Sequence, residues 1–362
     1  MPCRRAITMT DVILAATILV ALVVGVVALA RFDLSGDEGN RLPPSAEYEL
    51  EKYKKIDSSL IGYRQTGSMD VEMAEPRTLD VGPNGRFYVA GDRAVAVFDE
   101  EGVKQTNFSL GSPPQCAVMT GEDHAAGKRL YVGMKDHVEV YSLDGKRLAA
   151  WDTIGPKALV TALVAGEEDL FVADAVGKVI LRYDPGGKLL GRIGERNPAT
   201  RPVGFVVPSP YFDMVLPPDG LLRVVNPGRH TIEAFTVEGH FEKPLTWGRP
   251  MMLAKPWVAG FCGCCNPAHL ALLLDGRFVT AEKGIPQVKV FSSTGEFECV
   301  VAGPETLEPT PTAAEETRDA HRLKPVDVAT DDKGRILVLD PAARAIRIFE
   351  ANMELTEGSE KK

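Results

Sequence analysis

Positive charge, cysteine and familiar catalytic motifs are all scarce in this chain of 362 residues. Acidic residues outnumber basic residues by 50 to 41, and the net charge of −9 repels nucleic-acid phosphates. Six cysteines are too few for a fold held together mainly by disulfides. No nucleophile elbow, phosphate loop or dinucleotide fingerprint is present. We therefore expect no nucleic-acid partner, and none of the enzyme classes that those motifs mark.

What the chain does contain is a repeated phrase, a β-branched run that ends in an aromatic residue. Successive copies end 43, 42, 52, 56 and 58 residues apart, which is typical of four-stranded propeller blades. A turn, usually with glycine, follows each copy, and another short apolar run precedes it. We therefore predict an all-β, six-bladed β-propeller. The copies are Val95–Phe98, Val138–Tyr141, Val179–Tyr183, Ile232–Phe235, Val288–Phe291 and Ile346–Phe349.

The ends of the repeat region indicate how the ring closes. The last repeat ends soon after Phe349 without a fourth strand, whereas a β-like run near Ile61 precedes the first full repeat. Pairing of these two segments would remove two exposed sheet edges. We predict a propeller over residues 57–351, with a Pro- and Glu-rich inserted loop at 303–324 and a disordered tail at 352–362.

Two phrases resemble the NHL-repeat family of six-bladed propellers: Leu170-Phe171-Val172-Ala173-Asp174 and Asn226-Pro227-Gly228-Arg229-His230. The resemblance covers about residues 57–351 and implies the propeller fold. It implies no single function, because propellers of this type include enzymes, scaffolds and nucleic-acid binders.

Residues 12–30 form an apolar stretch of the length needed to span a bilayer. Arg4 and Arg5 precede it, so the positive-inside rule places residues 1–11 in the cytoplasm. We expect a transmembrane anchor at 12–30, a linker at 31–56 and a propeller on the extracytoplasmic, periplasmic side, with a protein partner in the membrane or periplasm. A cleaved signal peptide is the alternative, because Ala28-Leu29-Ala30 mimics a cleavage site.

The passage Phe261-Cys262-Gly263-Cys264-Cys265-Asn266-Pro267 has no evident role in a propeller blade. Its spacing includes a Cys-x-x-Cys pair, which suits a metal, an iron-sulfur cluster or a redox disulfide. Cys3 precedes the membrane stretch, so five cysteines lie on the outer side and at least one is unpaired within the chain. A vicinal Cys264–Cys265 bond, or a Cys262–Cys265 staple, is the structural alternative.

Alignment of the blades gives one equivalent position at the channel mouth in each innermost strand. The six residues at this position are Thr78, Cys116, Thr161, Asp213, His269 and Asp327. A ring that contains Cys, His and two Asp beside a cysteine-rich loop suggests a convergent site. The candidate metal ligands are Cys116, Cys262, Cys264, Cys265, His269, Asp213 and Asp327.

Simpler roles exist for several of these residues. Asp213 and Asp327 can accept hydrogen bonds from backbone amides where strands begin. Cys299, in an outer strand, is expected to be a buried thiol that acts as a small hydrophobe.

Three functions fit the sequence. The first is a membrane-anchored binding or accessory module with a Cys-ligated zinc or iron-sulfur centre, which would transfer electrons if the centre is redox-active. The second is a metal-dependent lyase or lactonase-like enzyme, although only one histidine lies on the ring. The third is a protein-interaction scaffold stapled by disulfides.

Overall fold

A computed structural model of the chain describes Met9 and residues 53–198, 203–263, 265–307 and 325–352. The chain divides into two compact units, Met1–Lys52 and Tyr53–Lys362. No described helix is both long and apolar enough to cross a membrane. The expected anchor at 12–30, most of the linker, residues 308–324 of the inserted loop, the tail from 353 and Cys264 lie outside the described residues.

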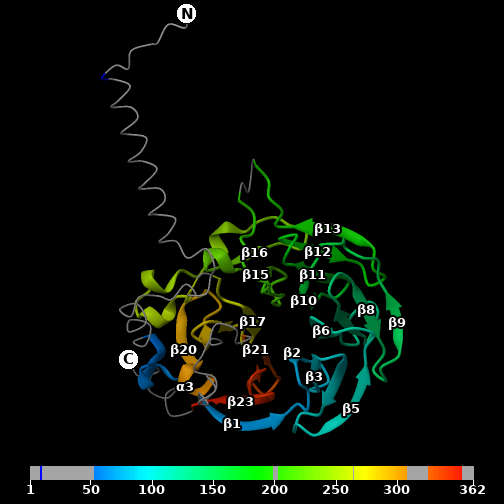
Figure 1. Cartoon of the computed structure of the whole chain (residues 1–362), viewed down its shortest axis with the longest axis horizontal. Coiled ribbons are helices and arrows are strands. Elements are labelled where there is room, and N and C mark those ends of the chain that lie inside the picture. Colours follow the sequence, from blue (N-terminus) through cyan, green and yellow to red (C-terminus); the bar gives the residue numbers. More distant parts are fainter. Residues whose placement is uncertain (1–8, 10–52, 199–202, 264, 308–324, 353–362) are drawn as a thin grey trace, which may run out of the picture. The chain divides into compact units, whose positions relative to one another are not determined.

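The second unit contains six antiparallel sheets, each of which is one blade (Figure 1). Blade 1 contains β2 (Pro76–Val81), β3 (Phe87–Gly91), β4 (Ala94–Phe98) and β5 (Lys104–Ser109); blade 2 contains β6 (Cys116–Met119), β7 (Leu130–Gly133), β8 (Val138–Tyr141) and β9 (Arg147–Ala150); blade 3 contains β10 (Val160–Ala165), β11 (Leu170–Asp174), β12 (Val179–Tyr183) and β13 (Leu189–Ile193). Blade 4 contains β14 (Met214–Val215), β15 (Leu222–Asn226) and β16 (Thr231–Phe235); blade 5 contains β17 (His269–Leu272), β18 (Phe278–Glu282), β19 (Gln287–Phe291) and β20 (Phe297–Ala302); blade 6 contains β21 (Asp327–Thr330), β22 (Ile336–Asp340), β23 (Ala345–Ala351) and β1 (Tyr63–Asp70).

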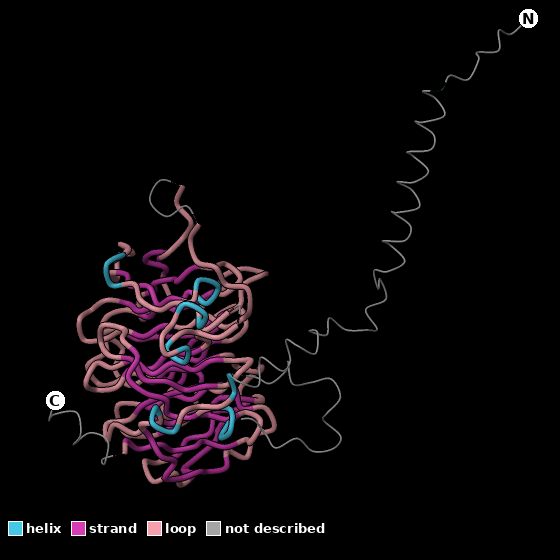
Figure 2. Tube along the Cα trace, turned by 90° about the vertical axis from the view of Figure 1, so that its left-hand side faces the viewer, coloured by secondary structure: helices cyan, strands magenta, loops and turns pink. Residues whose placement is uncertain are grey.

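The helices of the described part of the second unit are short, and all except η1 lie between strands along the chain (Figure 2). They are η1 (Ser58–Leu60), η2 (Pro227–Arg229), η3 (Lys243–Leu245), η4 (Met251–Leu253), η5 (Trp257–Ala259) and α3 (Pro304–Leu307). Three of them, η3 to η5, occupy the long connection between blades 4 and 5. The sequence-based prediction of an all-β propeller with six blades is confirmed.

The ring closes in blade 6, as the sequence predicts. Strand β1 is antiparallel to β23, in a register that runs from Tyr63 opposite Ala351 to Asp70 opposite Ala345. Figure 1 shows the two strands, blue and red, side by side. The earliest and latest described strands of the unit therefore share one sheet, and β23 is not left with a free edge.

Burial explains why the repeated phrase is so apolar. Each copy lies in the third strand of its blade, and β8 and β19 are buried at every position. The second strands β3, β11 and β22 are also buried throughout. Neighbouring blades cover these strands on both faces, so these second strands are almost wholly apolar. The third strands β8, β16 and β19 each bury one charged residue, Glu139, Glu233 and Lys289, among apolar ones. Outer strands such as β5 and β9 are mostly exposed.

Five turn glycines mark the junctions between blades. Each lies in the turn after the third strand, with φ between +82° and +94°. A β-carbon there would meet a large side chain from the preceding blade within 3.5 Å. The pairs are Gly102 with Met69, Gly145 with Phe108, Gly187 with Trp151, Gly239 with Ile193 and Gly295 with Trp247. Glycine is required here both for its positive φ and for the close approach.

Candidate functional site

The six residues predicted at the channel mouth all line one central cavity of about 840 Å³. The innermost strand of every blade contributes to its wall. Cys116, His269 and Asp327 begin their strands, whereas Asp213 directly precedes β14. The predicted placement of these positions around the channel is therefore confirmed.

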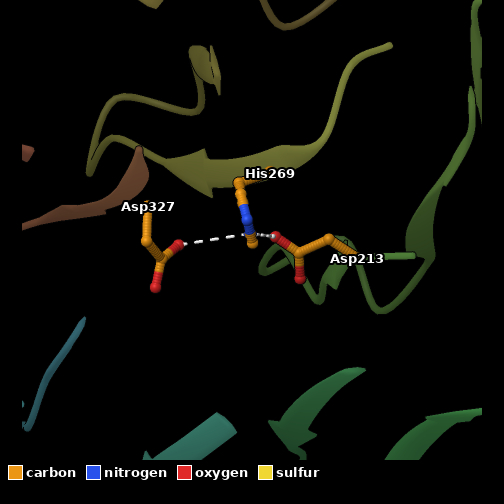
Figure 3. Close-up of side chains that lie close together, drawn as sticks. All are labelled: Asp213, His269 and Asp327. Atoms are coloured by element: carbon orange, nitrogen blue, oxygen red, sulfur yellow. Dashed lines mark ion pairs between the residues drawn. The ribbon is translucent and has the colours of Figure 1, made fainter. Parts of the chain in front are cut away.

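Asp213, His269 and Asp327 come together, from blades 4, 5 and 6. The His269 Nδ1 atom lies 3.5 Å from Asp213 Oδ2 and 3.3 Å from Asp327 Oδ1 (Figure 3). Across the part of the chain that the structure describes, this is the only group of three or more potential metal-ligating side chains whose ligand atoms lie within 4.8 Å of one another.

Backbone amides hold both carboxylates in place. Every carboxylate oxygen accepts one such hydrogen bond, at 2.8–2.9 Å. The donors are the amides of Met214 and Leu270 for Asp213, and of Val328 and Leu79 for Asp327. Both aspartates therefore accept hydrogen bonds from backbone amides, which is the structural role expected for them. Each oxygen has a second lone pair, so the same carboxylates can also bind a cation.

The site carries an excess of negative charge. Burial opposes a charge on His269, but Asp327 and Asp213 outweigh it, so the pKa of His269 is raised above its ordinary value. Burial and Asp213 raise the pKa of Asp327, although His269 acts in the opposite direction. Deeper in the channel, burial and the charge of Asp327 raise the pKa of Asp80 to about 6. One imidazolium cannot neutralise three carboxylates, so a cation would be stabilised here.

A smaller pocket of about 160 Å³ lies at the mouth, on the face where the inner strands begin. Arg77, Gln115 and Tyr211 line it together with Asp213 and His269. The Tyr211 ring lies edge-on to the His269 ring, with the two ring centroids 5.8 Å apart. We did not predict Arg77 or Tyr211 from the sequence. Arg77 lies one position before Thr78 and Tyr211 two before Asp213, so extending the aligned position toward the N-terminus would have found both.

Cys116 lines the channel but belongs to the packing between blades. Its sulfur lies against Gly133, where a β-carbon would clash with both Cys116 and Val160. Burial, together with Asp213 and Asp327, raises the pKa of the Cys116 thiol well above its usual value. The thiol form is therefore favoured over the thiolate that a metal ligand requires.

The cysteine-rich loop is fixed to blade 5. The Cys262 amide donates to Glu282 Oε2 at 2.6 Å, and Asn266 Nδ2 donates to the Cys262 carbonyl at 2.6 Å. Glu282 pairs with Lys289, whose ammonium also donates to the carbonyls of Val258 and Gly260 at 2.7 Å. Both side chains of this ion pair are buried. The loop is thus anchored through a charged pair inside the blade.

The described cysteines of this loop lie apart from the Asp-His-Asp group. Cys262 and Cys265 are buried and no disulfide joins them. Burial, reinforced by Glu282, raises the pKa of Cys262 to about 11. Among the described side chains, neither Cys116, Cys262 nor Cys265 joins His269 in a group with metal-ligand distances. The structure therefore brings together the oxygen and imidazole ligands of the predicted set, but not its described sulfurs.

Cys299 lies in β20 and packs against an apolar cluster, as expected, but it is half-buried rather than fully buried. A β-carbon at Gly62 would lie 2.5 Å from its sulfur. Burial raises the pKa of Cys299 to about 11.

No protein-family model matches the chain, and no curated protein matches it. Solved structures do. A streptogramin B lyase has a TM-score of 0.53 at 12% identity, over 82% of this chain and 100% of that one. A Bacteroides thetaiotaomicron protein of unknown function has a TM-score of 0.53 at 14% identity, over 80% and 76%. Virginiamycin B lyase from Staphylococcus aureus has a TM-score of 0.50 at 12% identity, over 80% and 100%. At these identities the likeness concerns the fold alone, and the chain is a six-bladed β-propeller with propeller neighbours.

Proposed function

We propose that this protein is a binding module that holds a divalent cation at the mouth of its propeller channel, with Asp213, His269 and Asp327 as ligands. The observation that carries the proposal is the convergence of these three side chains from three neighbouring blades within 4.8 Å. Two carboxylates and one imidazole suit zinc, manganese or iron(II), which accept mixed nitrogen and oxygen ligands.

The local charge supports a cation. Asp80, Asp213 and Asp327 line the same cavity, and burial together with a neighbouring carboxylate raises the pKa of Asp80 and that of Asp327. A divalent ion would remove this repulsion, because it supplies more positive charge than the imidazolium. The amide hydrogen bonds to both carboxylates would orient them as outer-shell partners commonly orient metal ligands.

The membrane attachment belongs to the same proposal. Its support is the apolar stretch 12–30 with Arg4 and Arg5 before it. A tethered, extracytoplasmic propeller would present its channel to ligands or to a protein partner outside the cytoplasm. A Cys-ligated zinc or iron-sulfur centre in the loop is a separate prediction, which involves Cys264.

An enzyme is the second candidate. Two of the similar folds are lyases, and in this chain an imidazole with a raised pKa lies at the channel mouth. A propeller enzyme would use the bound ion to polarise a substrate oxygen. Cation binding is common to both candidates, so it is tested first.

The test is calorimetric titration of the purified full chain with Zn²⁺ and with Mn²⁺. We expect one ion per chain, and a loss of affinity of at least ~10-fold in His269→Ala and in Asp213→Asn. The matched control is His240→Ala, which removes an exposed histidine outside the channel. Absence of binding in the native chain, or equal binding by His269→Ala and His240→Ala, would overturn the proposal. A circular dichroism spectrum of each variant confirms that it is folded.

A further inference from the structure

The mouth pocket has the construction of a small-molecule site. Most of its wall is apolar, formed by four prolines with Leu159 and Phe212. Its polar groups come from several blades. Arg77, Gln115 and Thr161 belong to blades 1, 2 and 3, and Asp213 and His269 belong to the Asp-His-Asp group, with Tyr211 beside His269. Apolar walls with a small number of placed polar groups are typical of ligand pockets.

Within the described part of the chain, Arg77 lacks the close carboxylate partner that several other arginines have. Its NH1 donates to Gln115 at 3.3 Å, its NH2 lies 3.9 Å from Glu75, and its Nε is buried without a hydrogen-bond partner. By contrast, the described pairs Arg182–Asp169, Arg335–Asp331 and Arg347–Asp340 have nitrogen–oxygen distances of 2.7, 2.5 and 2.9 Å. The Arg77 guanidinium therefore has donor capacity that no group among the described residues uses.

A second positive charge lies over the ring of Tyr211, which lines the pocket. The Lys283 ammonium is 5.8 Å from the centre of the Tyr211 ring. Arg77 also acts on Tyr211. Burial raises the pKa of the Tyr211 hydroxyl, and the positive charge of Arg77 partly opposes this increase. Tyr211 thus lies under the influence of two cations, Arg77 and Lys283.

We propose that the mouth pocket binds a small monocarboxylic acid, with the carboxylate paired to Arg77 and the apolar body against Tyr211 and the proline walls. The planar guanidinium fork matches a carboxylate, and such charge-assisted pairs are stronger than neutral hydrogen bonds. A volume of about 160 Å³ restricts the ligand to a small molecule. The inference rests on the proposed function in placing the ligand at the channel mouth, but it requires no bound cation.

The experiment is calorimetric titration of the full chain with propionate and with benzoate, once with a chelator present and once with Zn²⁺. Propionamide and benzamide are the uncharged counterparts. Arg77→Gln removes the positive charge. Arg77→Lys keeps the charge but removes the planar guanidinium group that can donate two parallel hydrogen bonds to a carboxylate. Arg86→Gln is the matched control, because Arg86 is exposed in the turn after β2 and lies outside both cavities.

We expect saturable binding of the carboxylates in the millimolar range or tighter, and amide binding at least ~10-fold weaker. Arg77→Gln should weaken carboxylate binding by ~10-fold or more, Arg77→Lys by less, and Arg86→Gln should bind like the native chain. Absence of saturable binding, equal binding of amides, or equal behaviour of Arg77→Gln and Arg86→Gln would each overturn the inference. If the chain binds carboxylates through Arg77 but binds no cation, only the proposed function is overturned. If the chain binds a cation but no carboxylate, only this inference is overturned.

Discussion

Asp327 in β21 accepts a hydrogen bond from the amide of Leu79 in β2, at 2.8 Å, across the junction between blades 6 and 1. Similar bonds join other inner strands around the channel. They run from the Met119 amide to Asp80, from Thr161 to the Phe212 carbonyl, from the Leu270 amide to Asp213 and from Thr330 to the Leu272 carbonyl. The polar residues of the channel therefore join the blades and also form the proposed site.

Asp80→Asn tests the charge in the channel through pH dependence. Because the pKa of Asp80 is raised to about 6, the native state holds its proton more tightly than the unfolded chain does. Its contribution to stability is therefore greatest below about pH 4 and is lost as the pH rises toward about 6. We expect Asp80→Asn to remove this loss, and so to gain ~1–3 kcal/mol relative to the native chain between about pH 4 and pH 7.

Urea unfolding at both pH values measures the effect. Asp152→Asn is the control, because Asp152 is exposed and outside the channel. If Asp80→Asn and Asp152→Asn show the same pH dependence, burial and Asp327 do not raise the pKa of Asp80 in the native chain.

Gly187→Ala tests the packing of turn glycines between blades. A β-carbon at Gly187 would lie 2.5 Å from the Trp151 ring, whereas one at Gly220 would meet no atom within 4 Å. Both glycines have positive φ, of 90° and 75°, so the backbone cost of alanine is similar. We expect Gly187→Ala to be less stable than Gly220→Ala by ~1–3 kcal/mol, measured by urea unfolding. Equal losses would show that the contact with Trp151 is not tight.

Lys289→Met tests the ion pair that anchors the cysteine-rich loop. The change leaves Glu282 without its counter-ion and removes the donor to the Val258 and Gly260 carbonyls. Removal of one partner from a buried pair commonly costs ~3 kcal/mol or more. The double variant Glu282→Gln with Lys289→Met keeps an acceptor for the Cys262 amide and no net charge, so it should be more stable than Lys289→Met alone. A double variant that is less stable than the single one would refute the importance of the unpaired charge.

Metal analysis of anaerobically purified protein tests the cysteine centre. If Cys262, Cys264 and Cys265 hold iron or zinc, Cys262→Ser should remove stoichiometric metal and leave the propeller folded, whereas Cys299→Ser should retain it. The raised pKa of Cys262 works against such a centre, because a ligand sulfur must be deprotonated. Metal content that is the same in Cys262→Ser and in the native chain would rule it out.

The sequence predicts the blades well because a strand buried on both faces is mostly apolar along its length, as in Val95–Phe98. It also predicts closure near Ile61, since blade 6 otherwise has an unpaired edge. The channel positions follow from repeat alignment. Repeat alignment does not predict the direction of each side chain. Cys116 occupies an aligned position, yet its sulfur packs against Gly133. Likewise, the convergence of Asp213 and Asp327 on His269 depends on how neighbouring blades are turned, which no local pattern encodes.

The most direct measurement is anomalous diffraction from crystals of the protein soaked in Mn²⁺ or Zn²⁺. We predict a single strong peak within ligand distance of Asp213, His269 and Asp327, and loss of that peak in His269→Ala crystals. No peak at this position, or a peak only at the cysteine-rich loop, would contradict cation binding at the channel mouth.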